Sequence, residues 1–459
     1  MKVNKYAKLF QGQSIILIVC ILFIWLNRFA TLAFYPKTTF LPDAADSLPT
    51  RLFEFNKVSL IGNAPRPFVT NIIYAMIPFD LLQLFQLVLS GIASTFFLIS
   101  LHRIFRSTLA KNFAVSSVTI LLASNTFLNW DNIANIQSIT NSLLLFSLSV
   151  LIFFFKTNTL KLLMFFQFLT ILLVVQRPSF ILFYFITNLI LIKMIYTQKR
   201  NLLILVPIIT FISGMIFCVV HTKNQDNHWP GNFSGLQISG FLLPVSPVSE
   251  EFKEYLESKN APECLLIDSR YSLFEGERFC SEALAWVEKY ATQNFRQFLM
   301  SNPESAMKIV FYGLYGAFVG SSLNYGNSAV LTPPIYEILV LGSRQPNSLT
   351  FFESSESIRY YTQIPIYSYS FILLVLAISQ LKSIRSNPRL SALLKLGSIL
   401  ILLGFLTIIS TSLAVYTEWT RVLFPFQILI YLGLCITFAT IFDIKKSNSY
   451  SINYAQNSK

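Results

Sequence analysis

Two acidic residues, Asp43 and Asp46, directly follow the first long apolar segment of the chain. Most of their neighbours between Leu41 and Thr50 are apolar or proline. A carboxylate in such surroundings is a candidate general base, because it can accept a proton from a reacting hydroxyl or amine. An Asp just before an amphipathic run is also a normal helix N-cap, and this alternative stays open.

Four arginines are candidates for binding a phosphate group, since a guanidinium can hold phosphate through two hydrogen bonds. They are Arg66, Arg177, Arg359 and Arg421. The alternative for each is a side chain that reaches the lipid headgroups, or a local ion pair. Arg421 has Glu418 as its neighbour for such a pair, and Glu418 is itself a candidate substrate contact.

Asp131, in the sequence Trp130-Asp131-Asn132, is a further candidate for the same site. The alternative, which residue chemistry favours, is a solvated turn residue. Arg28 lies in the outer part of the first apolar segment, and we expect it to extend toward the headgroups.

The sequence predicts neither a metal site nor a bound cofactor. Its three histidines lack compact metal-ligand spacing, and the chain contains no P-loop, GxGxxG or CxxC motif. Cys264 and Cys280 fall in the one large hydrophilic segment, where a disulfide between them is possible in an oxidising compartment. Cys20, Cys218 and Cys435 are expected to be small packing residues in or beside apolar spans.

The composition predicts an all-α polytopic membrane protein. Of the 459 residues 54% are hydrophobic and 12% are charged, and apolar stretches of roughly 17 to 23 residues, each able to cross a bilayer, recur. Ten spans are predicted from the sequence: 14–34, 81–101, 112–129, 139–155, 160–176, 179–195, 201–220, 364–381, 396–414 and 422–442. Charged residues are nearly absent inside them, which favours a working site at the outer membrane surface and disfavours a carrier.

Lysine and arginine set the predicted orientation. They cluster at the N-terminus, in alternate loops and at the start of the C-terminal tail, so both termini are expected to be cytoplasmic. The net charge of +13 then reflects contact with membrane lipids and not with nucleic acid.

Three regions follow from these spans. Residues 1–220 form an N-terminal membrane module whose first outer loop, 35–80, carries an amphipathic interfacial helix near 48–60. Residues 221–363 form a small, mostly helical extracytoplasmic segment, in which the spacing of apolar residues predicts helices over 250–258 and 281–300. An interfacial or re-entrant helix is predicted near 306–322. Residues 364–459 form a C-terminal membrane module and a cytoplasmic tail.

The layout resembles the GT-C superfamily of integral-membrane glycosyltransferases. Asp46-Ser47 is similar to the Asp-Ser pair that follows the first span in that superfamily, and Arg66 to Tyr74 to the interfacial part of its first loop. Asn125 to Leu145 looks like the second outer loop, although many members carry Glu where Asn141 stands. Further similar segments are Gln176-Arg-Pro178, Phe295 to Pro303 and Glu418 to Pro425.

The resemblance implies transfer of a sugar from a polyprenyl-phosphate carrier to a glycan, lipid or protein acceptor on the extracytoplasmic face. Asp46, or else Asp43, would be the base, and Arg421 and Arg177 would bind the lipid phosphate. Compact loops favour a bacterial inner (plasma) membrane. Two alternatives stay open: an O-antigen polymerase or ligase-like protein, and a non-catalytic transporter or scaffold.

Overall fold

A computed structural model describes residues 14–34, 39–40, 60, 67–134, 136–157, 159–198, 205–226, 238, 246–267, 281–318, 388–413 and 425–443. Its fold is helical apart from one pair of two-residue strands in these ranges, β1 (Thr39–Phe40) and β2 (Ile133–Ala134). The helices of the N-terminal module are α2 (Ile15–Phe34), α4 (Phe68–Met76), α5 (Phe79–Ile104), α6 (Thr108–Leu122), α7 (Asn125–Asn132), α8 (Ile136–Thr157), α9 (Leu160–Gln176), the 3-10 helix η2 (Pro178–Phe180), α10 (Ile181–Gln198) and α11 (Leu205–Asp226). Beyond them come α13 (Ser249–Glu257), α14 (Glu263–Ile267), α15 (Ser281–Ser301), α16 (Pro303–Phe318), α19 (Pro388–Ser412) and a last helix, Pro425–Asp443.

Seven of the described helices are long and apolar enough to cross a membrane, so the chain is an integral membrane protein. They are Ile15–Ala33, Phe79–Ile104, Ile136–Thr157, Pro178–Tyr196, Leu205–Asn224, Leu390–Ser412 and Pro425–Asp443. Helices suit lipid because every backbone N–H and C=O is satisfied within the segment. Large apolar side chains such as Phe168, Ile209 and Ile216 point outward and are more than half exposed, as expected for residues that contact lipid.

The predicted spans compare closely with these helices. The spans near 14–34, 81–101, 139–155, 179–195, 201–220, 396–414 and 422–442 each have a long helical counterpart. The span near 160–176 is the shorter apolar helix α9. The span near 112–129 is wrong as one helix, because α6 ends at Leu122 and α7 begins at Asn125. The span near 364–381 lies outside the described residues.

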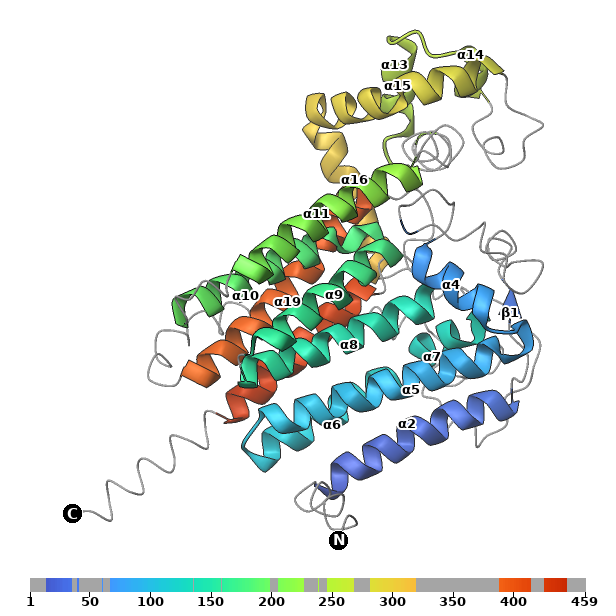
Figure 1. The fold of residues 1–459 in the computed structure, drawn as a ribbon. Coiled ribbons are helices and arrows are strands. Elements are labelled where there is room, and N and C mark those ends of the chain that lie inside the picture. The colour runs from blue at the N-terminus through green and yellow to red at the C-terminus, as the bar shows by residue number, and fades with distance from the viewer. Residues whose placement is uncertain are drawn as a thin grey trace.

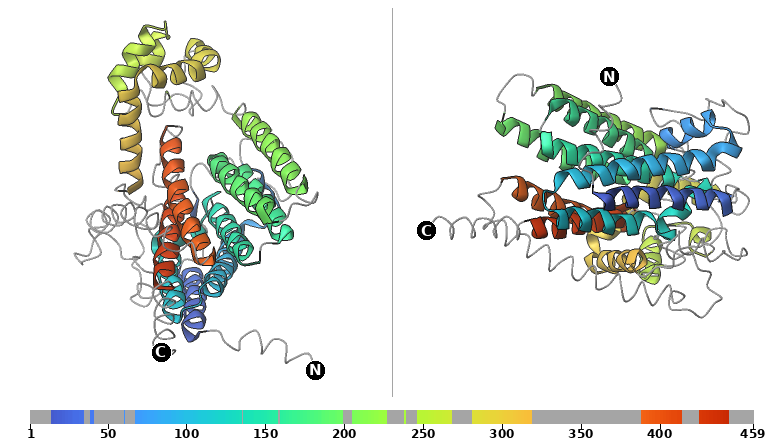
Figure 2. Two further views of the ribbon diagram at one scale, coloured as in Figure 1. Left: turned by 90° about the vertical axis from the view of Figure 1, so that its left-hand side faces the viewer. Right: turned by 90° about the horizontal axis from the view of Figure 1, so that it is seen from below.

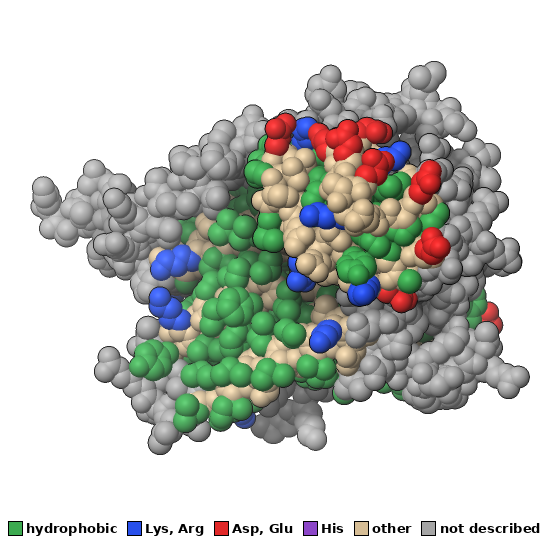
Figure 3. Space-filling view, turned by 90° about the horizontal axis from the view of Figure 1, so that it is seen from above, with side chains coloured by type: hydrophobic (Ala, Val, Ile, Leu, Met, Phe, Trp, Pro, Cys, Tyr) green, Lys and Arg blue, Asp and Glu red, His purple; other side chains and the backbone are tan. Residues whose placement is uncertain are grey.

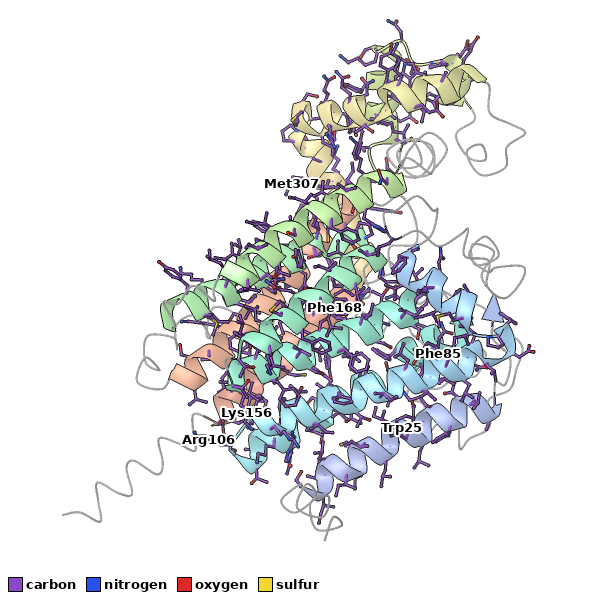
Figure 4. All side chains as sticks on the ribbon, viewed as in Figure 1. Trp25, Phe85, Arg106, Lys156, Phe168 and Met307 are labelled. Carbon is purple, nitrogen blue, oxygen red and sulfur yellow. The ribbon has the colours of Figure 1, made fainter. Side chains whose placement is uncertain are left out.

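In the N-terminal module, membrane helices that follow one another in the sequence run in opposite directions. Helix α5 packs against α2, α6 and α8, of which α8 runs parallel to it, and α8 packs against α9 (Figure 1). Loops between neighbouring helices are short, as is usual for antiparallel helix pairs. The two ends of the bundle therefore collect alternate loops. Arg106 at the α5–α6 loop and Lys156 near the end of α8 lie together at one end (Figure 4), which we call the basic end. The opposite end is called the distal end.

The last helix lies against both α19 and the N-terminal module. Gly433 meets Gly397 of α19 so closely that a Cβ at Gly433 would lie 2.7 Å from the Gly397 carbonyl oxygen. At the basic end the Asp443 carboxylate accepts hydrogen bonds from the backbone N–H of Ser107 (2.6 Å) and of Arg106 (3.2 Å). Halfway along the helix, the Tyr431 hydroxyl donates to the Ser117 carbonyl of α6.

Helices α13 to α16 form a small outer unit beyond the distal end (Figure 2). Helices α13, α14, α15 and α16 share a core around Phe252, Val287 and Phe298. The predicted helices 250–258 and 281–300 correspond to α13 and α15. Acidic side chains gather on this unit (Figure 3), with exposed Glu250, Glu251, Glu254 and Glu257 all on α13.

Helix α16 covers much of the apolar segment predicted near 306–322. It packs against α19, and Leu314 joins the core of the membrane bundle. Met307 and Phe311 of the same helix are more than half exposed. The depth at which α16 meets the membrane stays a prediction.

Candidate functional site

The candidate site lies at the distal end, where α7 meets the first two turns of α8. Of the residues proposed from the sequence, the structure describes Asp131, Arg177 and Cys264. The others lie outside the described residues, and their roles stay predictions: Asp43, Asp46, Arg66, Arg359, Glu418, Arg421 and Cys280. Cys264 forms a disulfide, and Cys20, Cys218 and Cys435 are free and buried, as expected for packing residues.

Asp131 is a buried side chain near the end of α7 and is not the solvated turn residue that residue chemistry favoured. Its Oδ1 accepts a hydrogen bond of 2.6 Å from the Ser138 hydroxyl of α8. Burial raises the pKa of the Asp131 carboxyl to about 6, although Arg28 and the hydroxyls of Ser138 and Ser90 oppose the shift. The carboxyl can therefore exchange a proton near neutral pH.

Arg28 is fully buried in α2, so the expectation that it extends to the headgroups is wrong. Its Nη1 donates to the Leu122 carbonyl (3.0 Å) and to Asn27 Oδ1 (3.1 Å). Its Nη2 donates to the hydroxyls of Ser90 (3.1 Å) and Ser94 (3.3 Å) on α5. The guanidinium also lies 5.9 Å from the centre of the Phe127 ring.

Arg28 and Asp131 are thus both buried, and they interact electrostatically, although the hydrogen bonds of the Arg28 guanidinium go to other groups. A buried charge costs several kcal/mol unless a partner and hydrogen bonds compensate it. Inside a membrane protein an ionisable side chain in the bundle interior is by default a functional candidate. The sequence signal was present, because Arg28 interrupts an otherwise apolar segment, but its burial depends on contacts with α5 and α6.

Arg177 is the second buried guanidinium at the distal end, between α9 and η2. Its Nη1 donates a hydrogen bond of 2.7 Å to Gln137 Oε1 on α8. The neighbouring Gln176 accepts from the backbone N–H of Thr70 on α4 (3.1 Å) and donates to the Ile136 carbonyl (3.1 Å). The Gln176-Arg177 pair therefore joins α4, α8 and α9 at one point.

The first two turns of α8 connect the two guanidinium environments. Gln137 contacts Arg177 and donates to Asn141 Oδ1 at 3.0 Å, whereas the adjacent Ser138 contacts Asp131. Among the described residues, Asp131 Oδ2, Asn141 Nδ2 and Ser142 Oγ are buried without a hydrogen-bond partner. Such unpaired polar atoms are uncommon in folded proteins and indicate a place where water or a ligand group binds.

A buried polar stripe on α5 extends this environment into the bundle. Gln83, Gln86, Ser90 and Ser94 recur every three or four residues, so they share one face of the helix. Ser90 and Ser94 contact Arg28, and the Gln86 amide donates to the Tyr74 hydroxyl of α4. The sequence carried this periodicity, but only the packing shows that the stripe faces the protein and not the lipid.

The strand pair ties the first outer loop to the same place. Thr39 pairs with Ile133 and Phe40 with Ala134, in parallel register. Strand β2 occupies the link between α7 and α8, directly after Asp131. The chain segment that leads to Asp43 and Asp46 therefore leaves from the α7–α8 junction.

Nothing in the described part of the chain indicates a metal centre, since no three His, Cys, Asp or Glu residues there come together. The arrangement instead offers a carboxyl that can bind a proton, two guanidinium groups and several amide and hydroxyl groups. A comparison with protein-family models finds no match, and a comparison with curated proteins finds no relative.

Proposed function

We propose that the protein is a membrane glycosyltransferase that moves a sugar from a polyprenyl-phosphate carrier to a glycan, lipid or protein acceptor. The reaction takes place at the distal end, on the extracytoplasmic side of a bacterial inner membrane. The proposed orientation follows from the cations that gather at the basic end, near Arg106 and Lys156.

One observation carries the proposal: the α7–α8 junction gathers contributions from three outer loops that are separate in the sequence. Asp131 comes from the α6–α8 connection, Arg177 from the α9–α10 connection, and β1 from the loop after α2. Ser138 and Gln137, which are adjacent on α8, contact Asp131 and Arg177. A carboxylate and a guanidinium near one point suit a substrate that combines polar sugar groups with a phosphate.

Few residues separate Phe40 from the proposed base, and this limits how far the base can lie from the junction. Asp43 and Asp46 follow Phe40 by three and six residues in the sequence. An extended chain covers at most about 3.6 Å per residue, so the reach from Phe40 is limited to about 11 Å and about 22 Å, respectively. A general base within that reach can serve a substrate bound at the start of α8.

The chemistry assigned to these residues is a displacement at the anomeric carbon. An acceptor oxygen or nitrogen forms a bond to that carbon, its proton passes to Asp46, and the bond to the phosphate oxygen breaks. Arg177 and Arg421 stabilise the departing polyprenyl phosphate, where negative charge accumulates. Asp131 holds a sugar hydroxyl through the carboxylate oxygen that the fold leaves unpaired.

The test uses purified protein in liposomes with radiolabelled undecaprenyl-phosphate hexoses and pentoses as donors, and with glycans, lipids and proteins extracted from bacterial envelopes as acceptors. Wild-type protein is expected to release undecaprenyl phosphate from at least one donor, as measured by thin-layer chromatography. Asp46→Asn should lower the rate on the order of a hundredfold, since general-base catalysis contributes that much. Arg177→Lys should lower it about tenfold or more, because lysine cannot bind phosphate through two parallel hydrogen bonds.

Asp443→Asn is the matched control, because it removes a buried carboxylate at the basic end, far along the bundle. It should leave the rate within about twofold of wild type. Full activity in an Asp43→Asn/Asp46→Asn double variant would refute the assigned base. Failure of wild-type protein to consume any donor would refute the proposed reaction.

The buried Arg28–Asp131 pair favours a second candidate, a carrier that binds a charged or protonated solute inside the bundle. A carrier would exchange labelled lipid-linked sugar across the liposome membrane without breaking its glycosyl bond. The same liposomes separate the two candidates, because only the transferase changes the chemical identity of the donor.

A further inference from the structure

Two adjacent residues of α2 hold the end of α6. Asn27 Nδ2 donates a hydrogen bond of 3.1 Å to the Ala123 carbonyl, and Arg28 Nη1 donates one of 3.0 Å to the Leu122 carbonyl. The last carbonyls of a helix lack partners within the helix itself. Side chains from α2, nearly a hundred residues earlier in the sequence, therefore complete the C-terminus of α6.

This contact lies at the corner from which α7 and Asp131 project. Ser124 forms the corner itself: its hydroxyl donates to the Leu121 carbonyl (2.7 Å) and accepts from the Phe127 N–H (3.3 Å). Helix α7 also packs against α5, where Leu128 lies in one cluster with Leu87. With Asn27 and Arg28 in place, the corner is tied to a membrane span, and Arg28 is in turn tied to α5 through Ser90 and Ser94.

We propose that Asn27 and Arg28 are positioning residues: they fix the α6–α7 corner and so direct the Asp131 carboxyl toward the first two turns of α8. The inference rests on the proposed function, in which Asp131 contacts the sugar of the donor. Neither residue was assigned a role from the sequence.

Asn27 and Arg28 affect the site in different ways. Asn27 is uncharged: it acts on the position of the corner through Ala123, and its Oδ1 accepts a hydrogen bond from the Arg28 guanidinium. Arg28 acts on position through Leu122 and also places a positive charge near Asp131, which lowers the pKa of that carboxyl relative to burial alone. Variants of the two residues can therefore separate position from charge.

The first experiment measures whether α7 is held in place, without any donor. Leu128 of α7 is buried against Ala30 and Leu87, so Leu128→Cys provides a protected thiol. Cys20→Ala and Cys218→Ala remove two native thiols, and buried Cys435 of the last helix stays as an internal reference. The rate of labelling by N-ethylmaleimide is measured at both cysteines in the full-length protein in liposomes.

Asn27→Leu and Arg28→Lys should each raise the labelling rate at position 128 by roughly tenfold, because a looser corner opens more often. Lysine keeps the charge but cannot reach the Leu122 carbonyl and the two serines at once. The rate at Cys435 should stay unchanged. Equal rates in variants and wild type would overturn the proposal, as would a parallel rise at Cys435, which would mean that the fold as a whole loosens.

The second experiment measures the pH profile of donor consumption. In Arg28→Gln, the inflection of the pH–rate profile that reflects Asp131 should move to a pH about one unit higher, since an opposite nearby charge lowers a carboxyl pKa by one to three units. Asn27→Leu should lower the rate without moving that inflection. An unchanged profile in Arg28→Gln would contradict the electrostatic half of the proposal. The labelling rate at position 128 can rise in Asn27→Leu and Arg28→Lys even if wild-type protein consumes no lipid-linked sugar. In that case Asn27 and Arg28 position the corner as inferred, and only the proposed function fails.

Discussion

Asp131 and Asp443 are both buried carboxylates beside α6, but at opposite ends of the helix. Asp443 accepts hydrogen bonds from two backbone N–H groups at the start of α6, those of Ser107 and Arg106. Asp131 follows the end of α6, accepts a hydrogen bond of 2.6 Å from Ser138, and is also influenced by the Ser90 hydroxyl. Among the described residues, its second oxygen has no hydrogen-bond partner.

The difference separates a carboxylate that the fold uses from one that the fold leaves available. The contacts of Asp443 complete the N-terminus of α6, where a negative charge is favourable, and they fasten the last helix to the N-terminal module. The contacts of Asp131 do not account for its burial, because leaving a carboxylate oxygen unpaired in a low-dielectric interior is costly. We therefore interpret Asp443 as structural and Asp131 as part of a site.

Arg28→Met should have the largest effect on stability. The substitution leaves the Asp131 carboxyl and the Leu122 carbonyl without their cation, and breaking a buried charge pair typically costs about 3–5 kcal/mol. Equilibrium unfolding in mixed detergent micelles should show this loss at pH 8. The double variant Arg28→Met/Asp131→Leu should recover at least half of it, since the isolated charge is then gone. No recovery would mean that Asp131 does not depend on Arg28.

The pH dependence of stability should also distinguish Asp131 from a structural carboxylate. Its pKa in the folded protein is raised from 3.8 to about 6, so the folded state binds the proton more tightly than the unfolded state. This contribution is fully present below about pH 4 and is lost as the pH rises through about 6, with a size on the order of 2–3 kcal/mol.

The measurement compares the free energy of unfolding of wild type and Asp131→Asn at pH 4.5 and pH 8. The asparagine variant should gain relative to wild type as the pH increases, because it carries no charge to bury. A relative gain by wild type at pH 8 would instead show that the ionised carboxylate stabilises the fold.

Asp443→Asn should lower the free energy of unfolding by about 1–2 kcal/mol, as expected when a charge-assisted contact at a helix N-terminus is weakened. Both N–H groups that bind Asp443 lie at the start of α6, at the basic end. The loss of unfolding free energy should therefore be the same with and without the lipid-linked sugar. Thermal unfolding with and without undecaprenyl-phosphate hexose checks this. A ligand-dependent loss would show that the basic end takes part in binding.

The sequence was sufficient to locate the seven long apolar helices, because apolar length alone determines which segments can cross a bilayer. It also located the α13 and α15 helices from their apolar periodicity. It failed at 112–129, where Ala123 and Ser124 interrupt an apolar run without a proline or glycine. Side chains of α2 hold the end of α6 at this point, and no local pattern reveals those contacts.

The candidate site was predicted only in part. Asp131 and Arg177 were recognised as polar residues in short outer loops, and the structure brings both to the start of α8. Arg28, Ser138 and Gln137 were missed. A single polar residue in an apolar segment can face lipid headgroups or the bundle interior, and the choice depends on which faces of the helices meet. The available signals were Arg28 in an otherwise apolar segment and the polar stripe on α5.

Ser138 and Ser142 offer the finest test of the comparison, because both are buried hydroxyls on one face of α8, one turn apart. Ser138 donates to Asp131 at 2.6 Å, whereas Ser142 Oγ has no partner among the described residues. Ser138→Ala should therefore cost about 1–2 kcal/mol of unfolding free energy, and Ser142→Ala should be neutral or slightly stabilising. With the lipid-linked sugar bound, the difference in unfolding free energy between the two variants should become smaller, because the Ser142 hydroxyl gains a partner. If Ser142→Ala is as costly as Ser138→Ala without any donor, water already satisfies the hydroxyl, and the unpaired groups of α8 would not mark a ligand site.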